Sequence, residues 1–226
     1  MNIGGLQKMT LLDYPGKIAC TVFLSGCNLR CPFCHNASLV LPRRLSPVMT
    51  QEELLVFLRS RVRRLDGVCI TGGEPTLYHN LPQLIGEIRE LGFSVKLDTN
   101  GSSPEMLKTV LPMVDYVAMD IKNAPEKYEE TCGGVDILAQ AKESVSLLMD
   151  SGVDYEFRTT VCHPFHTPED LDRIGRWLAG AKQYYIQQFV DSGDLVGEAS
   201  ALSSEEMQAL LEAVLPHIPN AKVRGL

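Results

Sequence analysis

The sequence predicts an α/β fold: a partial (β/α)6 TIM-like barrel with a parallel sheet, open on one side. Short apolar runs alternate six times with segments of helical periodicity, which is typical of parallel strands joined by helices. A complete barrel needs eight strands and about 250 residues, whereas this chain has 226 residues. No linker or low-complexity segment interrupts the alternation. We therefore expect one domain over residues 1–226, with its core at about 13–190 and a C-terminal helix and tail at 191–226.

Apolar runs bounded by turn residues give the expected strands, which are residues 18–24, 68–71, 93–98, 116–122, 154–161 and 183–190. Capping residues and helical spacing give the expected helices, which are residues 50–65, 80–91, a segment opened by Ser103, 136–150, a segment opened by Thr167, and one from Ser203 to before Pro216. Residues 1–17 are expected to be an irregular lead-in.

Charged side chains share one face of three predicted strands. Because side chains alternate along a strand, the charged set is Lys96 and Asp98, then Asp120 and Lys122, then Glu156 and Arg158. The apolar sets on the opposite faces should contact the helices, so the charges should point into the barrel lumen. The pattern predicts a polar pocket there, and internal ion pairs are the other interpretation.

Composition limits the classes of partner. Apolar residues make up 45% of the chain and charged residues 22%, which is ordinary for a protein with a buried core, and the formal net charge of −7 argues against nucleic acid or an anionic membrane as the main partner. No stretch approaches the roughly 20 apolar residues of a membrane-spanning helix, and no export signal is visible. We expect a cytoplasmic protein.

Three cysteines form a C-x3-C-x2-C run at Cys27, Cys31 and Cys34. With seven cysteines and no export signal, metal binding is favoured over disulfides. A cubane iron–sulfur cluster held by three thiolates leaves one iron open to a substrate. The other thiols are dispersed: Cys20 and Cys69 fall within strands, Cys132 is expected to be a loop thiol, and Cys162 lacks a complete ligand set with His163 and His166. One cluster is therefore expected.

The cysteine run and the Gly72, Gly73, Glu74, Pro75 turn together resemble the radical S-adenosylmethionine superfamily. The resemblance implies one [4Fe-4S] cluster ligated by Cys27, Cys31 and Cys34. It also implies S-adenosyl-L-methionine as a cofactor, cleaved reductively to a 5′-deoxyadenosyl radical. Taken alone, the glycine turn could be an ordinary strand-to-helix turn.

The same resemblance implies roles for the cofactor-binding residues. Phe33 resembles the aromatic residue near the adenine, and Gln188 ends the sixth strand close to the expected adenine position. The Gly72, Gly73 and Glu74 turn would meet the methionine amine, with glycine permitting close approach.

Further along the chain, Asp98 and Asn100 resemble a ribose and carboxylate region, and Lys122 and Arg158 could meet the carboxylate. Asp98 and Asp120 are similar in position to residues that bind a monovalent cation.

A narrower resemblance comes from the flanks. Asp13 to Gly16 before the cysteines, and His35 and Asn36 after them, resemble glycyl-radical-enzyme activating proteins, most closely those of anaerobic ribonucleoside-triphosphate reductase. The resemblance implies a glycyl radical enzyme as protein substrate, with anaerobic ribonucleotide reductase as the expected partner, and a reducing electron donor. Asp13 is a candidate catalytic residue that could face the cluster or the incoming glycine, or could only shape its turn.

Two other functions remain open at this point. A radical enzyme acting on a small molecule, similar to 7-carboxy-7-deazaguanine synthase, would keep the same chemistry with another substrate. A non-catalytic iron–sulfur or zinc module would normally have four protein ligands, and the run supplies three.

Overall fold

The computed structural model describes residues 1–41 and 47–225. Its strands form one eight-stranded sheet in the order β1 to β8. The strands are β1 (Ile3–Thr10), β2 (Ala19–Leu24), β3 (Gly67–Gly72), β4 (Ser94–Thr99), β5 (Tyr116–Asp120), β6 (Asp154–Val161), β7 (Tyr184–Gln188) and β8 (Lys222–Arg224). The helices are α1 (Ala37–Val40), α2 (Gln51–Arg59), α3 (Leu81–Glu90), α4 (Pro104–Val110), α5 (Tyr128–Thr131), α6 (Leu138–Asp150), α7 (Pro168–Trp177) and α8 (Ser204–Val214).

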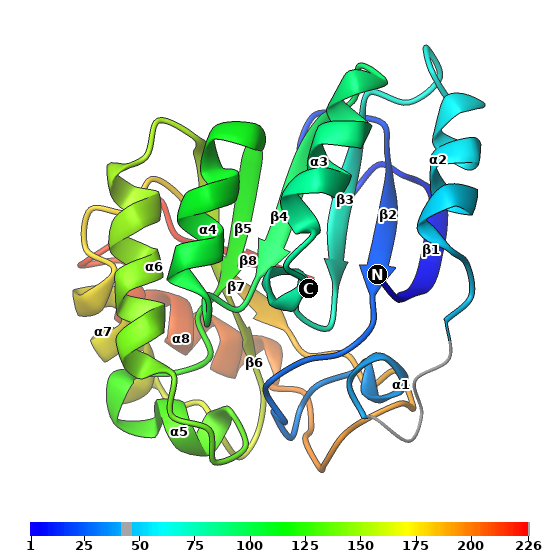
Figure 1. Ribbon diagram of the computed structural model, residues 1–226. Helices are drawn as coiled ribbons and strands as arrows, with labels where there is room; N and C mark the ends of the chain where they lie inside the picture. The colour runs from blue at the N-terminus through cyan, green and yellow to red at the C-terminus, as the bar shows by residue number, and fades with distance from the viewer. Residues whose placement is uncertain (42–46, 226) are drawn as a thin grey trace.

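The predicted fold class is confirmed. All neighbouring strands from β2 to β8 pair in parallel, and β2 to β7 are the six predicted strands. In the part of the chain that the structure describes, β1 and β8 lie at opposite ends of the strand order, so the barrel is not closed. Figure 1 shows α2, α3, α4 and α6 covering the outer face of the curved sheet.

The N-terminal segment was predicted incorrectly as an irregular lead-in. It forms β1, which pairs with β2 in antiparallel orientation. Two irregularities in register, between Ile3 and Gly5 and between Gln7 and Thr10, break the alternation that marks a regular strand. The sequence signal for β1 is therefore weak.

Local sequence explains how the predicted helices begin. Thr50, Thr167 and Ser203 each accept a hydrogen bond from the backbone three residues ahead, in capping boxes that start α2, α7 and α8. The first of these helices ends at Arg59, before the expected residue 65, and Arg63 has a φ of 65°. Within the described ranges, none of the helices has the length and apolar character needed to span a membrane.

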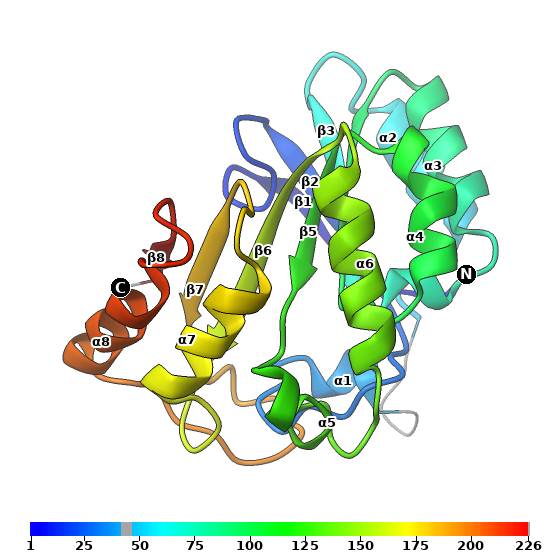
Figure 2. The same cartoon turned by 90° about the vertical axis from the view of Figure 1, so that its left-hand side faces the viewer.

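The loops after the parallel strands gather at one end of the barrel. Figure 2 shows α1, α5 and the connections that follow β5 and β6 on this side of the molecule. Because carboxyl ends of parallel strands lie together, side chains from distant parts of the sequence can converge there. The cysteine run follows β2 at this end.

Candidate functional site

The cysteine loop, defined as residues 26–36, is held closely against the turn after β3. The amide of Gly73 donates a 2.8 Å hydrogen bond to the carbonyl of Leu24, and the amide of Glu74 donates one of 2.8 Å to that of Gly26. A Cβ atom at position 73 would lie 2.0 Å from the Gly26 carbonyl oxygen. Glycine is therefore required at this position because the turn packs against the cysteine loop. The sequence predicted a different reason, which was close approach of the turn to a ligand.

Two further segments fix the rest of the cysteine loop. The amide of Arg30 donates to the carbonyl of Cys132 at 3.1 Å, which joins the loop to the end of α5. The amide of Val196 donates to the carbonyl of Cys34 at 3.1 Å. The chain after β7 thus packs on the cysteine loop, and the thiols are carried on a loop that is anchored on several sides.

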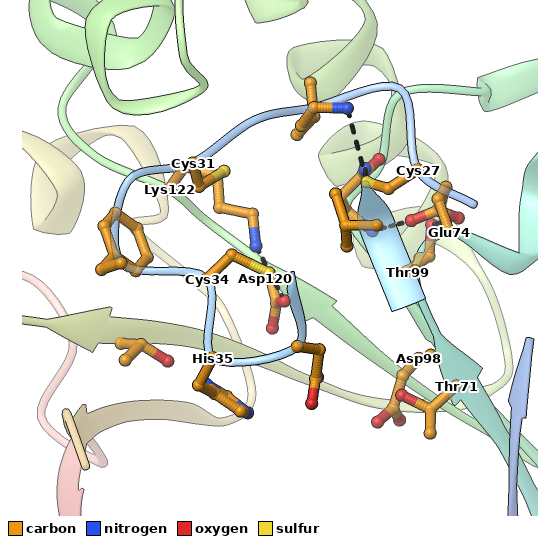
Figure 3. A pocket seen from close by; sticks show the side chains of 18 of the residues that line it. Cys27, Cys31, Cys34, His35, Thr71, Glu74, Asp98, Thr99, Asp120 and Lys122 are labelled. Atoms are coloured by element: carbon orange, nitrogen blue, oxygen red, sulfur yellow. Dashed lines mark hydrogen bonds and ion pairs between the residues drawn. The ribbon is translucent and has the colours of Figure 1, made fainter. Parts of the chain in front are cut away.

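One cavity lies between the cysteine loop and the ends of the strands, and Cys27, Cys31 and Cys34 all line it (Figure 3). Most of the other predicted site residues line the same cavity, and these are Phe33, Gly72, Gly73, Glu74, Asp98, Asn100, Asp120, Lys122 and Arg158. The structure therefore brings together residues from the cysteine loop and four different strand ends.

The donor set fits an iron–sulfur cluster. Thiolates are the usual protein ligands of such clusters, and the three thiols face one cavity from one loop. Across residues 1–41 and 47–225, no three Cys, His, Asp or Glu side chains are close enough to bind one ion together.

Glu74 is almost fully buried, and its carboxylate joins the turn after β3 to the end of β4. It accepts hydrogen bonds from Thr99 Oγ1 at 2.8 Å and from the Asn100 amide at 2.6 Å, as well as from the amide and hydroxyl of Thr76. Burial raises the pKa of this carboxyl, and the hydrogen bonds oppose the rise. Glu74 therefore orders the cavity wall on which Asn100 is carried.

Asn100 connects this wall to the first cysteine. Its Nδ2 lies 3.8 Å from Cys27 Sγ and 3.2 Å from Asn28 Oδ1. The backbone amide of Leu29 also donates to Cys27 Sγ, at 3.4 Å. Hydrogen bonds of this kind orient a sulfur ligand and tune the metal centre that it holds.

Five of the six predicted lumen charges form a continuous network, and the sixth, Glu156, pairs with Arg224. Lys96 pairs with Asp98, Arg158 pairs with both Asp98 (3.1 Å) and Asp120, and Lys122 pairs with Asp120 at 3.0 Å. Both interpretations of the strand pattern apply, because the charged residues form internal ion pairs and also line polar cavities in the lumen. Asp98 and Asp120, the aspartates for which a monovalent cation is expected, are each already paired with two cationic side chains.

The network keeps its members charged. Burial by itself raises the pKa of Asp98 and Asp120, but Arg158 and the paired lysines outweigh it and hold both pKa values below the usual range. Burial lowers the pKa of Lys122, but Asp120 and then the nearby Cys31 reverse this, so the pKa is raised. In Figure 3, Lys122 extends past Cys31 toward Asp120.

A fourth thiol, missed in the sequence as a site residue, lies beside the cysteine loop. Cys132 is fully buried, and its carbonyl accepts the 3.1 Å hydrogen bond from the Arg30 amide of the cysteine loop. The Cys132 side chain is the main cause that lowers the pKa of Cys31 to about 7, against the effect of burial. The following glycine was the available signal, because a Cβ atom on Gly133 would lie 2.4 Å from the Arg30 carbonyl oxygen.

Phe33 lies at the wall of the cavity and is fixed by two neighbouring rings. Its ring centroid is 5.8 Å from those of both Phe165 and His166. His166 Nε2 lies 2.9 Å from the carbonyl of Lys122, and burial lowers the pKa of this histidine. His163 points elsewhere and lies 3.0 Å from a carboxylate oxygen of Glu206.

Two predicted site residues lie outside this cavity. Asp13 belongs to the connection between β1 and β2, at the amino end of β2, whereas the cysteine loop follows its carboxyl end; its carboxylate accepts a 2.6 Å hydrogen bond from Thr21 Oγ1. It lines a second cavity instead. Gln188 donates from Nε2 to the carbonyl of Leu202 at 2.6 Å. Neither residue is among the described residues that line the cavity beside the cysteine loop, and the adenine contact of Gln188 and the catalytic role of Asp13 stay predictions.

Comparisons with known proteins agree with this geometry. A family model described as the Radical SAM superfamily matches residues 21–178. A Methanocaldococcus jannaschii protein, which carries the provisional name of a glycyl-radical enzyme activating enzyme, is 32% identical over 99% of this chain and 96% of its own length. A 7-carboxy-7-deazaguanine synthase of Thermococcus kodakarensis is 29% identical over 61% of each chain.

Among solved structures, Streptococcus suis SuiB bound to its precursor peptide SuiA has a TM-score of 0.73 at 17% identity, and the match covers 91% of this chain and 48% of SuiB. At this identity the likeness shows the fold. The family model spans more than half of the chain and includes the cysteine loop, the glycine turn and the charged strands. This chain is therefore a member of the Radical SAM superfamily.

Proposed function

We propose that this protein is a glycyl-radical-enzyme activase, and that its partner is an anaerobic ribonucleoside-triphosphate reductase. The M. jannaschii relative supports the activase type, because the alignment covers nearly all of both chains. The synthase of T. kodakarensis aligns over a smaller part of each chain. The assignment of the reductase as partner is carried by the residues that flank the cysteines, Asp13 to Gly16 and His35 to Asn36.

The observation that carries the proposal is the three-thiol loop facing a charged cavity. Cys27, Cys31 and Cys34 would hold a [4Fe-4S] cluster and leave one iron without a protein ligand. When bound and reduced, such a cluster supplies the electron that cleaves S-adenosylmethionine to a 5′-deoxyadenosyl radical. The protein's task is to place the cofactor and to exclude water from a species that abstracts hydrogen from C–H bonds.

Two cations that line the cavity are placed to meet a ligand that carries a carboxylate. Lys122 and Arg158 pair with Asp120, and Arg158 also pairs with Asp98. A methionine carboxylate beside Lys122 or Arg158 would form charge-assisted hydrogen bonds with these cations. The turn that carries Glu74 would lie near the methionine amine, and Phe33 would lie near the adenine.

A protein substrate suits the open barrel. A glycine loop of a partner has to bring one Cα to the cavity, and the gap in strand pairing between β1 and β8 leaves the described barrel unclosed. The activase would take one hydrogen atom from that Cα. An external donor would supply the electron.

The competing function is a radical reaction on a small molecule. The similarity to the T. kodakarensis 7-carboxy-7-deazaguanine synthase suggests a deazaguanine precursor as that molecule. The two functions differ in where the final radical or product is found. A non-catalytic zinc module is disfavoured, because structural zinc takes four protein ligands and the cysteine run supplies three.

The deciding experiment is electron paramagnetic resonance under anaerobic conditions. The protein is reconstituted with iron and sulfide, reduced, and mixed with S-adenosylmethionine and a candidate anaerobic reductase. A glycyl doublet on the reductase is expected, and Cys34→Ala should give none. Cofactor cleavage without a doublet would exclude this reductase as the partner, and conversion of a deazaguanine precursor would favour the synthase instead.

A further inference from the structure

The chain between β7 and α8 packs along the second half of the cysteine loop. Residues 191–197 of this connection, which we call the clamp segment, lie beside α1 in both views of the molecule (Figures 1 and 2). The amide of Val196 donates to the carbonyl of Cys34 at 3.1 Å, and that of Gly197 donates to the carbonyl of Pro32 at 2.8 Å. A Cβ atom on Gly197 would lie 3.0 Å from Pro32 Cβ. The clamp segment therefore contacts the cysteine loop closely where the loop carries Cys34.

Asp194 connects the clamp segment to the beginning of α1. Its backbone carbonyl accepts a 3.1 Å hydrogen bond from the Ala37 amide, and its carboxylate accepts one of 2.8 Å from the Ser38 amide. The first amides of a helix have no partner within the helix, and Asn36, the N-cap residue of α1, makes no capping hydrogen bond with its side chain. Asp194 therefore caps α1 in place of the local sequence.

The clamp segment has its own internal order. The amide of Asp194 donates to Ser192 Oγ at 3.2 Å, and the Ser192 hydroxyl donates to the carbonyl of His35 at 2.8 Å. Residues 191–197 are not among the described residues that line the cavity. They therefore act on the site through the cysteine loop and not through contact with a bound cofactor.

We propose that Asp194 is a positioning residue for the third cysteine of the run: by fixing the beginning of α1, it holds Cys34 where this thiol ligates the cluster. Cys27, at the other end of the run, has a separate support in Asn100. A side chain that is already held in place loses less conformational freedom when it binds. The inference rests on the ligand role of Cys34 in the proposed function.

The test compares two variants of Asp194 with a matched control. Asp194→Ala removes the carboxylate that accepts from the Ser38 amide, and Asp194→Asn keeps an acceptor oxygen there. Glu198→Ala is the control, since it removes an equal charge from an exposed position on the same connection. Each cluster-free protein is treated briefly with iodoacetamide under native, reducing conditions, and mass spectrometry gives the alkylation rates of Cys34 and Cys27.

Asp194→Ala should raise the alkylation rate of Cys34 about tenfold, because the loss of a hydrogen bond to a charged group shifts a local opening equilibrium by about that factor. The rate at Cys27 should stay unchanged. Asp194→Asn should restore most of the protection of Cys34, and Glu198→Ala should match the wild type. After anaerobic reconstitution, iron should pass to the chelator bathophenanthroline disulfonate faster from Asp194→Ala than from the other proteins.

An unchanged rate at Cys34 in Asp194→Ala would overturn the inference. So would an equal rise at Cys27 and Cys34, which would indicate general loosening of the cysteine loop, or an asparagine variant that behaves as the alanine variant does. Failure of the wild type to assemble any cluster would refute the proposed function instead, and the alkylation rates, which are measured without a cluster, keep the two results distinguishable.

Discussion

Replacing Gly73 by alanine tests whether the cysteine loop depends on close packing against the turn after β3. The added Cβ would lie 2.0 Å from the carbonyl oxygen of Gly26, which is about 1.4 Å short of the 3.4 Å at which ordinary contact begins. The contact is with backbone, so no flexible side chain can move aside. The cysteine loop must therefore shift, and the 2.8 Å hydrogen bond from the Glu74 amide to Gly26 is lost with it.

Overpacking costs about 1–3 kcal/mol and a lost hydrogen bond about 0.5–1.5 kcal/mol, so Gly73→Ala should reduce the free energy of unfolding by about 2–4 kcal/mol. For a chain of this length, that lowers the melting temperature by about 4–16 °C. Displacement of the cysteine loop should also lower the iron and sulfide bound after anaerobic reconstitution. Circular dichroism melts and chemical iron determination measure the two effects.

Gly86→Ala provides the control. Gly86 lies within α3, and the nearest atom to an added Cβ is Met113 Cε at 3.9 Å. Alanine there should leave iron content unchanged and stabilise the helix by up to about 1 kcal/mol. If Gly73→Ala melts and binds iron as the wild type does, the proposed packing of turn and loop is incorrect.

Three further predictions concern buried charge. Glu74→Gln should lower the free energy of unfolding by about 1–3 kcal/mol, because the amide cannot accept all the hydrogen bonds that reach the carboxylate, including that from Asn100; a denaturation curve equal to that of the wild type would contradict this. Lys96→Met should cost about 3–5 kcal/mol in the same assay by leaving a buried carboxylate short of one partner, and a cost below about 1 kcal/mol would argue against the ion pair. Burial raises the pKa of Asp120, but Arg158 outweighs this and depresses it, so the stability that this aspartate contributes is present above the ordinary pKa of 3.8 and is lost as pH falls below it. Asp120→Asn should flatten that loss in urea titrations carried from about pH 5 down to about pH 2, and an unchanged pH dependence would exclude the effect.

The core of the fold was predictable because its signals are local. Apolar runs and capping residues located all six strands from β2 to β7, and strand alternation placed Lys96, Asp98 and Arg158 in the lumen. The edges were not predictable. The strand β1 contains two irregularities in register, and β8 has only three residues. Because β8 was not predicted, the role of its residue Arg224 was missed too. Arg224 donates two 3.0 Å hydrogen bonds to the Glu156 carboxylate.

In the candidate site, too, the residues with a local sequence signal were predictable and those that depend on tertiary contacts were not. The thiols, glycine turn and charges carry sequence signals, and the structure brings them to one cavity. Asp13 comes shortly before β2 in the chain, so it lies at the amino end of that strand, whereas the cysteine loop follows the carboxyl end. The contacts of Gln188 with Leu202 and of Cys132 with Arg30 join residues that are distant in the sequence, so local patterns do not reveal them.

The central claim is that the three thiols around the cavity support radical chemistry on S-adenosylmethionine. It is tested most directly by measuring 5′-deoxyadenosine after anaerobic reconstitution and reduction, in the wild type and in Cys31→Ala. The account predicts cluster iron and 5′-deoxyadenosine in the wild type and neither in the variant, with the same far-ultraviolet circular dichroism for both. An intact, reduced cluster that yields no 5′-deoxyadenosine, or a Cys31→Ala protein that still produces it, would contradict the account.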